Sequence, residues 1–158
     1  MSNPSRIDIE SPGINVAVIK KDPDGWKFLM LRRADKEIYP GLWGFLTGGR
    51  EGGETVPQLA VREMAEETGL TPEKLWATEY VFQFYEPTVD KIWLLPVVVA
   101  VVAPGSRVRL SPENSDFRWL GVSAAIDLVI WQNLKEVLRN IDRELAGYPA
   151  GNWIEITP

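Results

Sequence analysis

Three glutamates within residues 48–70 are spaced so that a helix would bring their carboxylates together. Glu63, Glu66 and Glu67 recur at intervals of three and four residues. An α-helix turns about 100° per residue, so these side chains would share one face. Like charges at this spacing destabilise an isolated helix by roughly 0.2–0.5 kcal/mol per pair, and only Arg62 is close enough in sequence to offset them. The pattern therefore points to a cation site, because a bound cation would remove the repulsion.

The residue types that are missing narrow the chemistry further. The chain has 158 residues but no cysteine and no histidine. This excludes disulfides, thiolate nucleophiles, Cys/His zinc sites and histidine-dependent triads. The remaining acid, base and ligand groups are chiefly carboxylates, and oxygen ligands suit hard ions such as Mg²⁺ or Mn²⁺.

The charge balance indicates which partners the chain can have. Its net charge of −5 and pI of about 4.9 argue against nucleic acid, whose binding depends on Lys and Arg neutralising phosphates. A small phosphorylated substrate fits if metal ions screen its charge. The longest apolar run, residues 92–104, is shorter than the roughly 20 residues of a membrane helix, so we expect a cytoplasmic protein without a membrane partner. The sequence leaves monomer and homodimer open, and the tail at 151–156 could be an edge strand or a dimer contact.

The first half of the chain reads as an arm followed by strands. Residues 1–12 are predicted to form a flexible N-terminal arm, and residues 13–158 a single domain. Two apolar runs at 14–19 and 27–32 flank an Asp-Gly turn, which predicts a β-hairpin. A further short strand at 43–47 leads into a glycine-rich loop.

A helix is predicted to follow this loop. Thr55 is a suitable N-cap, Pro57 suits the first turn, and Gly69 is a typical C-terminal stop. The side opposite the three glutamates is expected to pack against the rest of the domain, and it includes Met64 and Ala65.

The second half adds strands and a second long helix. Residues 78–85 and 92–102 are predicted strands, the latter so uniformly apolar that both of its faces should be covered. Segment 107–110 is a further candidate strand, and residues 123–145 have the apolar spacing of one amphipathic helix. The order of elements predicts an α+β fold with a mixed β-sheet between helices.

The glycine loop and helix match a family signature position by position. Gly48 is followed after five residues by Glu54, after seven more by Arg62-Glu63-Met64, and then by Glu66-Glu67 and Gly69-Leu70. This segment resembles the Nudix box, and the predicted elements around it fit the α/β/α sandwich of Nudix domains. The resemblance implies a metal-dependent hydrolase that cleaves a nucleoside diphosphate linked to another group, by attack of water at phosphorus.

The resemblance also implies roles for the matching residues, with Mg²⁺ or Mn²⁺ as the cofactor. Glu63 and Glu67 would be the main metal ligands, joined by Glu66 and the Gly48 carbonyl. Arg62 would orient a carboxylate of the catalytic site, and Glu54 would be architectural. Divalent ions can neutralise transition-state charge and make hydroxide available near neutral pH, which explains a need for this cluster.

A base or a further metal ligand in this family often comes from a later loop. Glu113 is the candidate for both roles, because it lies six residues before Trp119-Leu120. Asp116 is the nearest alternative. Glu86 and Asp90 are weaker alternatives.

Residues outside the box indicate the substrate. Segments 42–54, 117–120 and 131–133 resemble the dihydroneopterin triphosphate pyrophosphatase group, also described as dATP pyrophosphohydrolases. We therefore expect a nucleotide-like triphosphate, either dihydroneopterin triphosphate or a (d)NTP. The alternatives are a dinucleoside polyphosphate hydrolase and a non-catalytic Nudix-fold ligand-binding domain.

The aromatic residues supply candidate surfaces for stacking a base or a pterin. Stacking on such rings contributes about 1–3 kcal/mol per base. Trp43, Phe84 and Trp131 are the candidates for substrate binding, with Phe82 and Tyr85 as further possibilities. A guanidinium matches phosphate geometry, so Arg33, or its neighbour Arg32, is a candidate phosphate contact.

Overall fold

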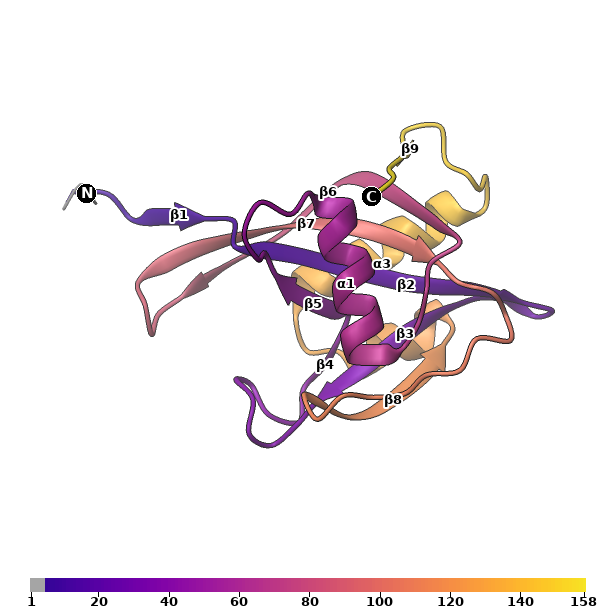
Figure 1. Cartoon of the computed structure of the whole chain (residues 1–158), viewed down its shortest axis with the longest axis horizontal. Coiled ribbons are helices and arrows are strands. Elements are labelled where there is room, and N and C mark those ends of the chain that lie inside the picture. The colour runs from indigo at the N-terminus through magenta and orange to yellow at the C-terminus, as the bar shows by residue number, and fades with distance from the viewer. Residues whose placement is uncertain (1–4) are drawn as a thin grey trace.

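A computed structural model describes residues 5–158 of the chain, as nine strands and three helices (Figure 1). The strands are β1 (Asp8–Glu10), β2 (Gly13–Asp22), β3 (Gly25–Arg33), β4 (Trp43–Gly44), β5 (Leu46–Gly49), β6 (Lys74–Glu86), β7 (Lys91–Val101), β8 (Asn114–Leu120) and β9 (Ile154–Glu155). The helices are α1 (Val56–Thr68), α2 (Val122–Leu128) and α3 (Gln132–Leu145). Among the described residues no helix is both long and apolar enough to cross a membrane.

The strands form one mixed sheet. The main path runs β4-β3-β2-β7-β6-β9, and β5 pairs with β2, β8 with β3 and β1 with β7. β2 and β3 form the predicted antiparallel hairpin, whereas β2 and β7 are parallel. The tail forms β9, an edge strand that pairs with β6.

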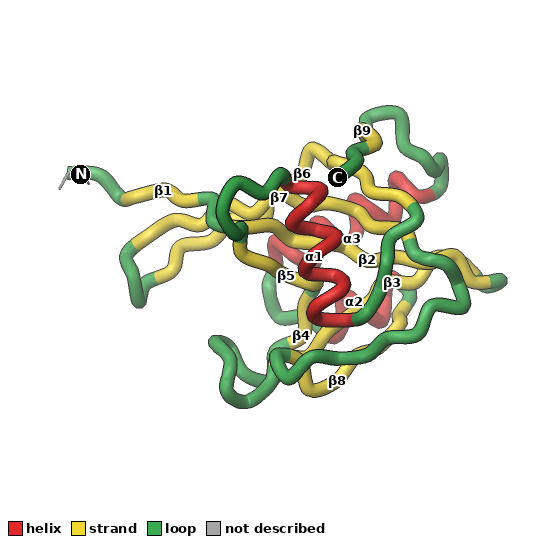
Figure 2. Tube along the Cα trace, viewed as in Figure 1, coloured by secondary structure: helices red, strands yellow, loops and turns green. Residues whose placement is uncertain are grey.

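Helices cover both faces of this sheet (Figures 1 and 2). On one face α1 packs over alternate residues of the central strands, including Val98 and Ala100 of β7. On the other face α2 and α3 pack over the intervening residues, including Val97 and Val99. Both faces of β7 are therefore covered, as predicted from its uniformly apolar sequence. This arrangement confirms the α/β/α sandwich.

Helix α1 begins and ends where the sequence indicates. The Thr55 side chain accepts a hydrogen bond from the backbone N–H of Gln58, and the Gln58 side chain accepts one from the backbone of Thr55. These reciprocal bonds satisfy two N–H groups that the first turn leaves without helical partners. Gly69 ends the helix with φ of 68°, a conformation that favours glycine.

The N-terminal region and two later segments differ from the prediction. Within the expected flexible arm, β1 pairs in parallel with β7, although residues 1–4 lie outside the described part of the chain. The expected strand at 43–47 is divided into β4 and β5, which pair with different strands. Segment 107–110 contains no strand.

The expected long helix at 123–145 is broken into α2 and α3. Val129 and Trp131 have extended backbones, with ψ angles of 149° and 119°. The break buries Val129 in the core and leaves Ile130 exposed, although both have the apolar spacing of one helix. It also brings Trp131 to the start of α3, where its ring packs edge-on against Tyr39 at a centroid distance of 5.5 Å. Apolar periodicity alone does not reveal such a break, because the two short helices share one buried face.

Candidate active site

The glycine loop lies directly against α1 because it lacks side chains at the contact. A Cβ atom on Gly48 would lie 2.2 Å from Cγ of Glu63 and 2.5 Å from its Cδ. A Cβ atom on Gly13, in the neighbouring strand β2, would lie 1.9 Å from the Gly48 carbonyl oxygen. All three separations are too short for real atoms. The Gly48 backbone can therefore approach the Glu63 side chain only because both positions are glycine.

Arg62 ties the loop to the helix. Its Nε and Nη2 atoms donate to the two carboxylate oxygens of Glu54, at 2.5 and 3.0 Å. Nη2 also donates to the Gly49 carbonyl at 2.9 Å, while Nη1 donates to Glu63 at 3.0 Å and Glu66 at 3.1 Å. The pKa of Arg62 is raised, chiefly by its hydrogen bond to Glu54. Arg62 thus positions both acidic side chains and backbone, as its expected orienting role requires.

The glutamates of α1 do not form a simple solvated face. Glu63 and Glu67 are buried, with exposed fractions of 9% and 5%, whereas the Glu66 side chain is 58% exposed. Ala65, expected on the packed side, is exposed. Burial raises the pKa of Glu63 despite its contact with Arg62. Burial, followed by hydrogen bonding to the Glu113 carboxyl, raises the pKa of Glu67 to about 8.

The loop before β8 brings Glu113 to these carboxylates. Asn114 donates a side-chain hydrogen bond to Glu67 at 3.3 Å, and the backbone N–H of Ser111 donates to the Glu67 carbonyl at 3.0 Å. On the other side, the Glu113 carbonyl accepts from the backbone of Ala34 at 2.9 Å. These contacts place the Glu113 side chain beside α1, 46 residues from Glu67 in sequence.

The alternatives to Glu113 lie elsewhere. Asp116 bonds its neighbour's backbone N–H, at Phe117, and does not line the pocket described below. Asp90 accepts a hydrogen bond from Tyr85 at 2.8 Å on the exposed β6–β7 turn. Glu86 does line the pocket, but it bonds Tyr39 and Thr88 instead of the α1 carboxylates.

The donor set fits a hard divalent cation. Glu63, Glu67 and Glu113 supply only oxygen atoms, and no Lys or Arg of the described residues forms an ion pair with Glu67 or Glu113. Within residues 5–158, no three acidic side chains are arranged closely enough to bind one metal ion together. Arg62 holds Glu63 and Glu66 instead. Poor solvation and mutual repulsion raise the pKa values of the Glu63 and Glu67 carboxyl groups. A bound cation would stabilise their charged forms and so lower these pKa values.

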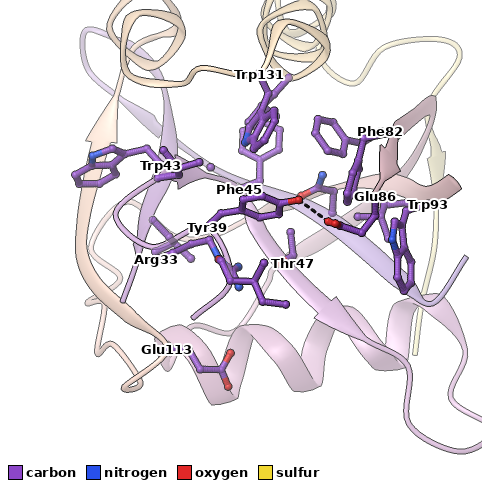
Figure 3. A pocket seen from close by; sticks show the side chains of 18 of the residues that line it. Arg33, Tyr39, Trp43, Phe45, Thr47, Phe82, Glu86, Trp93, Glu113 and Trp131 are labelled. Carbon is purple, nitrogen blue, oxygen red and sulfur yellow. Dashed lines mark hydrogen bonds between the residues drawn. The ribbon is translucent and has the colours of Figure 1, made fainter. Parts of the chain in front are cut away.

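A pocket of about 350 Å³ opens on this acidic cluster (Figure 3). Glu67 and Glu113 line one part of it. All four expected substrate-binding residues also line it, namely Arg33, Trp43, Phe84 and Trp131. Phe82 lines it as well, whereas Tyr85 and Arg32 do not. The fold therefore brings Glu67 of the box, Glu113 of the later loop and the candidate stacking rings together around one space.

The immediate partners of two candidates modify their expected roles. The Arg33 guanidinium donates to the Ile38 carbonyl at 2.5 Å and lies 3.7 Å from Glu37, so part of its hydrogen-bonding capacity is used. The Trp43 ring has the Arg118 guanidinium 4.9 Å from its centroid, which makes it a cation–π partner.

Sequence reasoning missed several pocket residues. Asn15 lines the pocket from strand β2. It is a lone polar residue in an apolar stretch, and this pattern could have indicated a functional role. Tyr39 has no such signal, because its place depends on a loop in which its φ is 57°. Its hydroxyl donates to Glu86 across the pocket (Figure 3).

The raised pKa of Glu67 leads to a prediction about stability. An unfolded glutamate has a pKa near 4.3, so between about pH 5 and 8 the folded protein holds a proton that the unfolded chain has lost. The free energy of unfolding of the metal-free protein should therefore fall as pH rises through this range. Glu67→Gln should flatten the dependence. Urea denaturation in EDTA at several pH values checks this, and an unchanged slope in the variant would contradict it.

Comparison with known proteins identifies the family. The NUDIX domain family model matches residues 11–141. An RNA pyrophosphohydrolase of Halorhodospira halophila is 30% identical over 92% of this chain and 87% of its own length. The chain belongs to the Nudix hydrolase family.

Other relatives of this chain differ in name and in length. An octanoyltransferase of Myxococcus xanthus is 31% identical over 85% of this chain, and a putative 8-oxo-dGTP diphosphatase 3 of Mycobacterium tuberculosis H37Rv is 32% identical over 72%. The matches cover 38% and 56% of those relatives. Membership of the family therefore does not specify the substrate.

Solved structures share the fold. A C. elegans Ap4A hydrolase superposes with a TM-score of 0.76, at 23% identity, over 88% of this chain and 100% of its own. The E. coli dihydroneopterin triphosphate pyrophosphohydrolase superposes with a TM-score of 0.64, at 21% identity, over 85% of this chain and 99% of its own. Both likenesses establish the fold alone.

Proposed function

We propose that this chain is a metal-dependent pyrophosphohydrolase that cleaves a nucleotide-like triphosphate by attack of water at phosphorus. One observation carries the proposal: a single pocket is lined at once by aromatic rings and by the acidic residues Glu67 and Glu113. The rings suit a flat heterocycle, and the carboxylates suit cation-bound phosphates. A domain that only binds its ligand has no chemical need for the acidic cluster.

The size of the pocket supports a substrate with one heterocycle. Its volume of about 350 Å³ is at the small end of the range of about 300–1,000 Å³ for small-molecule sites. A triphosphate of one base or pterin fits this range better than a dinucleoside polyphosphate, which carries two bases. Dihydroneopterin triphosphate and (d)NTPs are therefore the substrates that we propose.

The residues of the proposed site have two kinds of role, which are binding the metal ion and accepting a proton. Glu63, Glu66, Glu67, Glu113 and the Gly48 carbonyl would hold Mg²⁺ or Mn²⁺. The ion would neutralise phosphate charge and lower the pKa of bound water. Arg62 would keep Glu63 and Glu66 in place through the bonds described above. Glu113, whose carboxyl lies in hydrogen-bonding contact with that of Glu67, is the candidate to accept the proton of the attacking water.

A substrate panel tests this function. The purified chain would be incubated with Mg²⁺ and dihydroneopterin triphosphate, dATP, diadenosine polyphosphates or ADP-ribose, and the phosphate-containing products would be identified. We expect release of pyrophosphate from the triphosphates, abolished by EDTA. Preference for ADP-ribose or for diadenosine polyphosphates would overturn the proposed substrate class, and no turnover of any substrate would favour the ligand-binding alternative.

The assignment of Glu113 has its own test. Glu113→Gln should lower kcat about 100-fold or more, because general bases typically contribute 10²–10⁴-fold. Asp116→Asn is the matched control, since Asp116 lies outside the pocket and, among residues 5–158, its side chain accepts a hydrogen bond only from the neighbouring backbone N–H of Phe117. Steady-state kinetics on the preferred triphosphate provide the measurement. A loss in Asp116→Asn with normal activity in Glu113→Gln would move the assignment by three residues.

A further inference from the structure

A buried carboxamide faces the pocket without a partner. Asn15 is only 3% exposed and lines the pocket, yet its side chain forms no hydrogen bond within the described residues 5–158. In the same part of the chain, no side-chain polar atom is both sealed from solvent and unpartnered. The Asn15 amide must therefore open onto the pocket. Its donors and acceptor are available to a ligand.

The sheet holds this carboxamide at the aromatic part of the pocket. The Asn15 backbone lies between Thr47 of β5 and Val97 of β7. Its neighbours Ile14 and Val16 point to the α1 side, so Asn15 points to the side of α2 and α3. The pocket's rings belong to the same side: Phe45, Phe82 and, packed against them, Trp43, Phe84 and Trp131.

A second polar group in this pocket is a buried carboxylate without a cation. Glu86 is 8% exposed and has no ion-pair partner among the described residues. Its Oε1 accepts from the Thr88 backbone at 3.1 Å and the Thr88 hydroxyl at 2.8 Å, and its Oε2 accepts from the Tyr39 hydroxyl. These bonds lower the pKa of Glu86, the Tyr39 bond most of all. A carboxylate has about four acceptor positions, so one remains for a donor on the ligand.

The two groups are complementary to one kind of heterocycle. A carboxamide pairs bidentately with an edge that presents N–H beside C=O, and a carboxylate accepts from an amino group. Glu113 and Trp131 lie at opposite ends of the view in Figure 3, with the Tyr39–Glu86 pair between them, so the heterocycle and the phosphates have separate places. Guanine and pterins share the required edge, a 2-amino-4-oxopyrimidine ring.

We infer that Asn15 and Glu86 read the 2-amino-4-oxopyrimidine edge of the substrate's heterocycle, Asn15 at the lactam and Glu86 at the 2-amino group. This inference rests on the proposed function for the phosphate end of the same site. These two contacts favour guanine nucleotides and dihydropterins over adenine and pyrimidine nucleotides. They also give Tyr39 a positioning role, because Tyr39 orients Glu86.

Substrate analogues crossed with variants test each contact separately. The full chain would be assayed with Mg²⁺ on dGTP, on dITP, which lacks the 2-amino group, and on 2-aminopurine deoxyribonucleoside triphosphate, which lacks the oxo group. Asn15→Leu should lower kcat/KM about tenfold for dGTP and dITP but not for the 2-aminopurine analogue. Glu86→Gln should lower it about 10- to 100-fold for dGTP and the 2-aminopurine analogue but not for dITP.

Controls separate recognition from folding. Asn140→Leu places the same substitution in α3 outside the pocket and should leave all three substrates unchanged. Asn15→Ser also removes the carboxamide, so it tests the same contact if the Asn15→Leu variant does not fold. Equal losses on all analogues in the Asn15 variants, or a wild-type protein that does not prefer dGTP over its analogues, would overturn the inference.

A binding measurement without metal separates this inference from the proposed hydrolysis. Deoxyguanosine and neopterin would each be titrated calorimetrically into the wild-type protein and Asn15→Leu. Weaker binding of either compound to the variant supports the inference even if no triphosphate is hydrolysed, and the tighter ligand shows whether guanine or pterin is the source. Hydrolysis without base preference, together with equal binding to both proteins, would leave the proposed function standing and overturn the inference.

Discussion

Glu67→Gln is expected to lower turnover of the preferred triphosphate by about 100- to 10,000-fold while the fold stays intact. The Glu67 side chain is buried beside Glu113 and accepts a hydrogen bond from Asn114. The substitution keeps the shape of the side chain but removes the charge that a divalent cation requires. Steady-state kinetics over a range of Mg²⁺ concentrations measure the loss, and thermal denaturation checks the fold.

The metal-free Glu67→Gln protein should be no less stable than the wild type above neutral pH. The amide cannot ionise, so the cost of a buried, poorly solvated carboxylate disappears. Glu79→Gln is the matched control, because Glu79 is exposed on β6 and does not line the pocket. Near-normal Mg²⁺-dependent turnover in Glu67→Gln would contradict the assignment of the site.

Local features of the sequence predicted much of the fold. The boundaries of α1 follow from Thr55 and Gly69, because capping depends on a few neighbouring residues. The central position of β7 follows from its apolar run, since only a strand covered on both faces needs one. The break between α2 and α3 was not predictable in this way. The break accompanies the packing of Trp131 against Tyr39, and these two residues are too distant in sequence for apolar spacing to indicate their contact.

The residues of the site also differ in how far the sequence predicted them, depending on whether their role rests on local spacing or on distant contacts. The residues of the box are contiguous, so their spacing alone indicates the acidic helix face and the orienting arginine. Burial of Glu63 and Glu67 was not apparent, because it depends on the glycine loop and on the segment before β8 that cover them. Asn15 lies in strand β2 and Tyr39 in the loop between β3 and β4, and only folding brings both residues to one pocket.

Gly48→Ala is expected to reduce kcat by about 100-fold, because the new methyl group would displace the Glu63 side chain. In the wild-type protein that methyl position lies 2.2 Å from Cγ and 2.9 Å from Oε1 of Glu63. Either the carboxylate or the loop must shift, and a shift of about 1 Å in a catalytic group can cost about 100-fold in rate. The displaced Glu63 would also lose its 3.0 Å hydrogen bond from Arg62. Kinetics against Mg²⁺ concentration should show a weaker response to the ion.

The neighbouring glycine provides the matched control. A Cβ atom on Gly49 would meet no atom of the described residues within 4 Å, apart from those of Gly49 and its two chain neighbours, so Gly49→Ala adds the same methyl group to the same loop without displacing Glu63. Its backbone carbonyl can still accept the 2.9 Å hydrogen bond from Arg62. The difference between the two variants therefore measures the contact between the loop and Glu63, with loop flexibility changed alike in both. Equal kcat values for Gly48→Ala and Gly49→Ala would show that the approach of this backbone to Glu63 does not matter for catalysis.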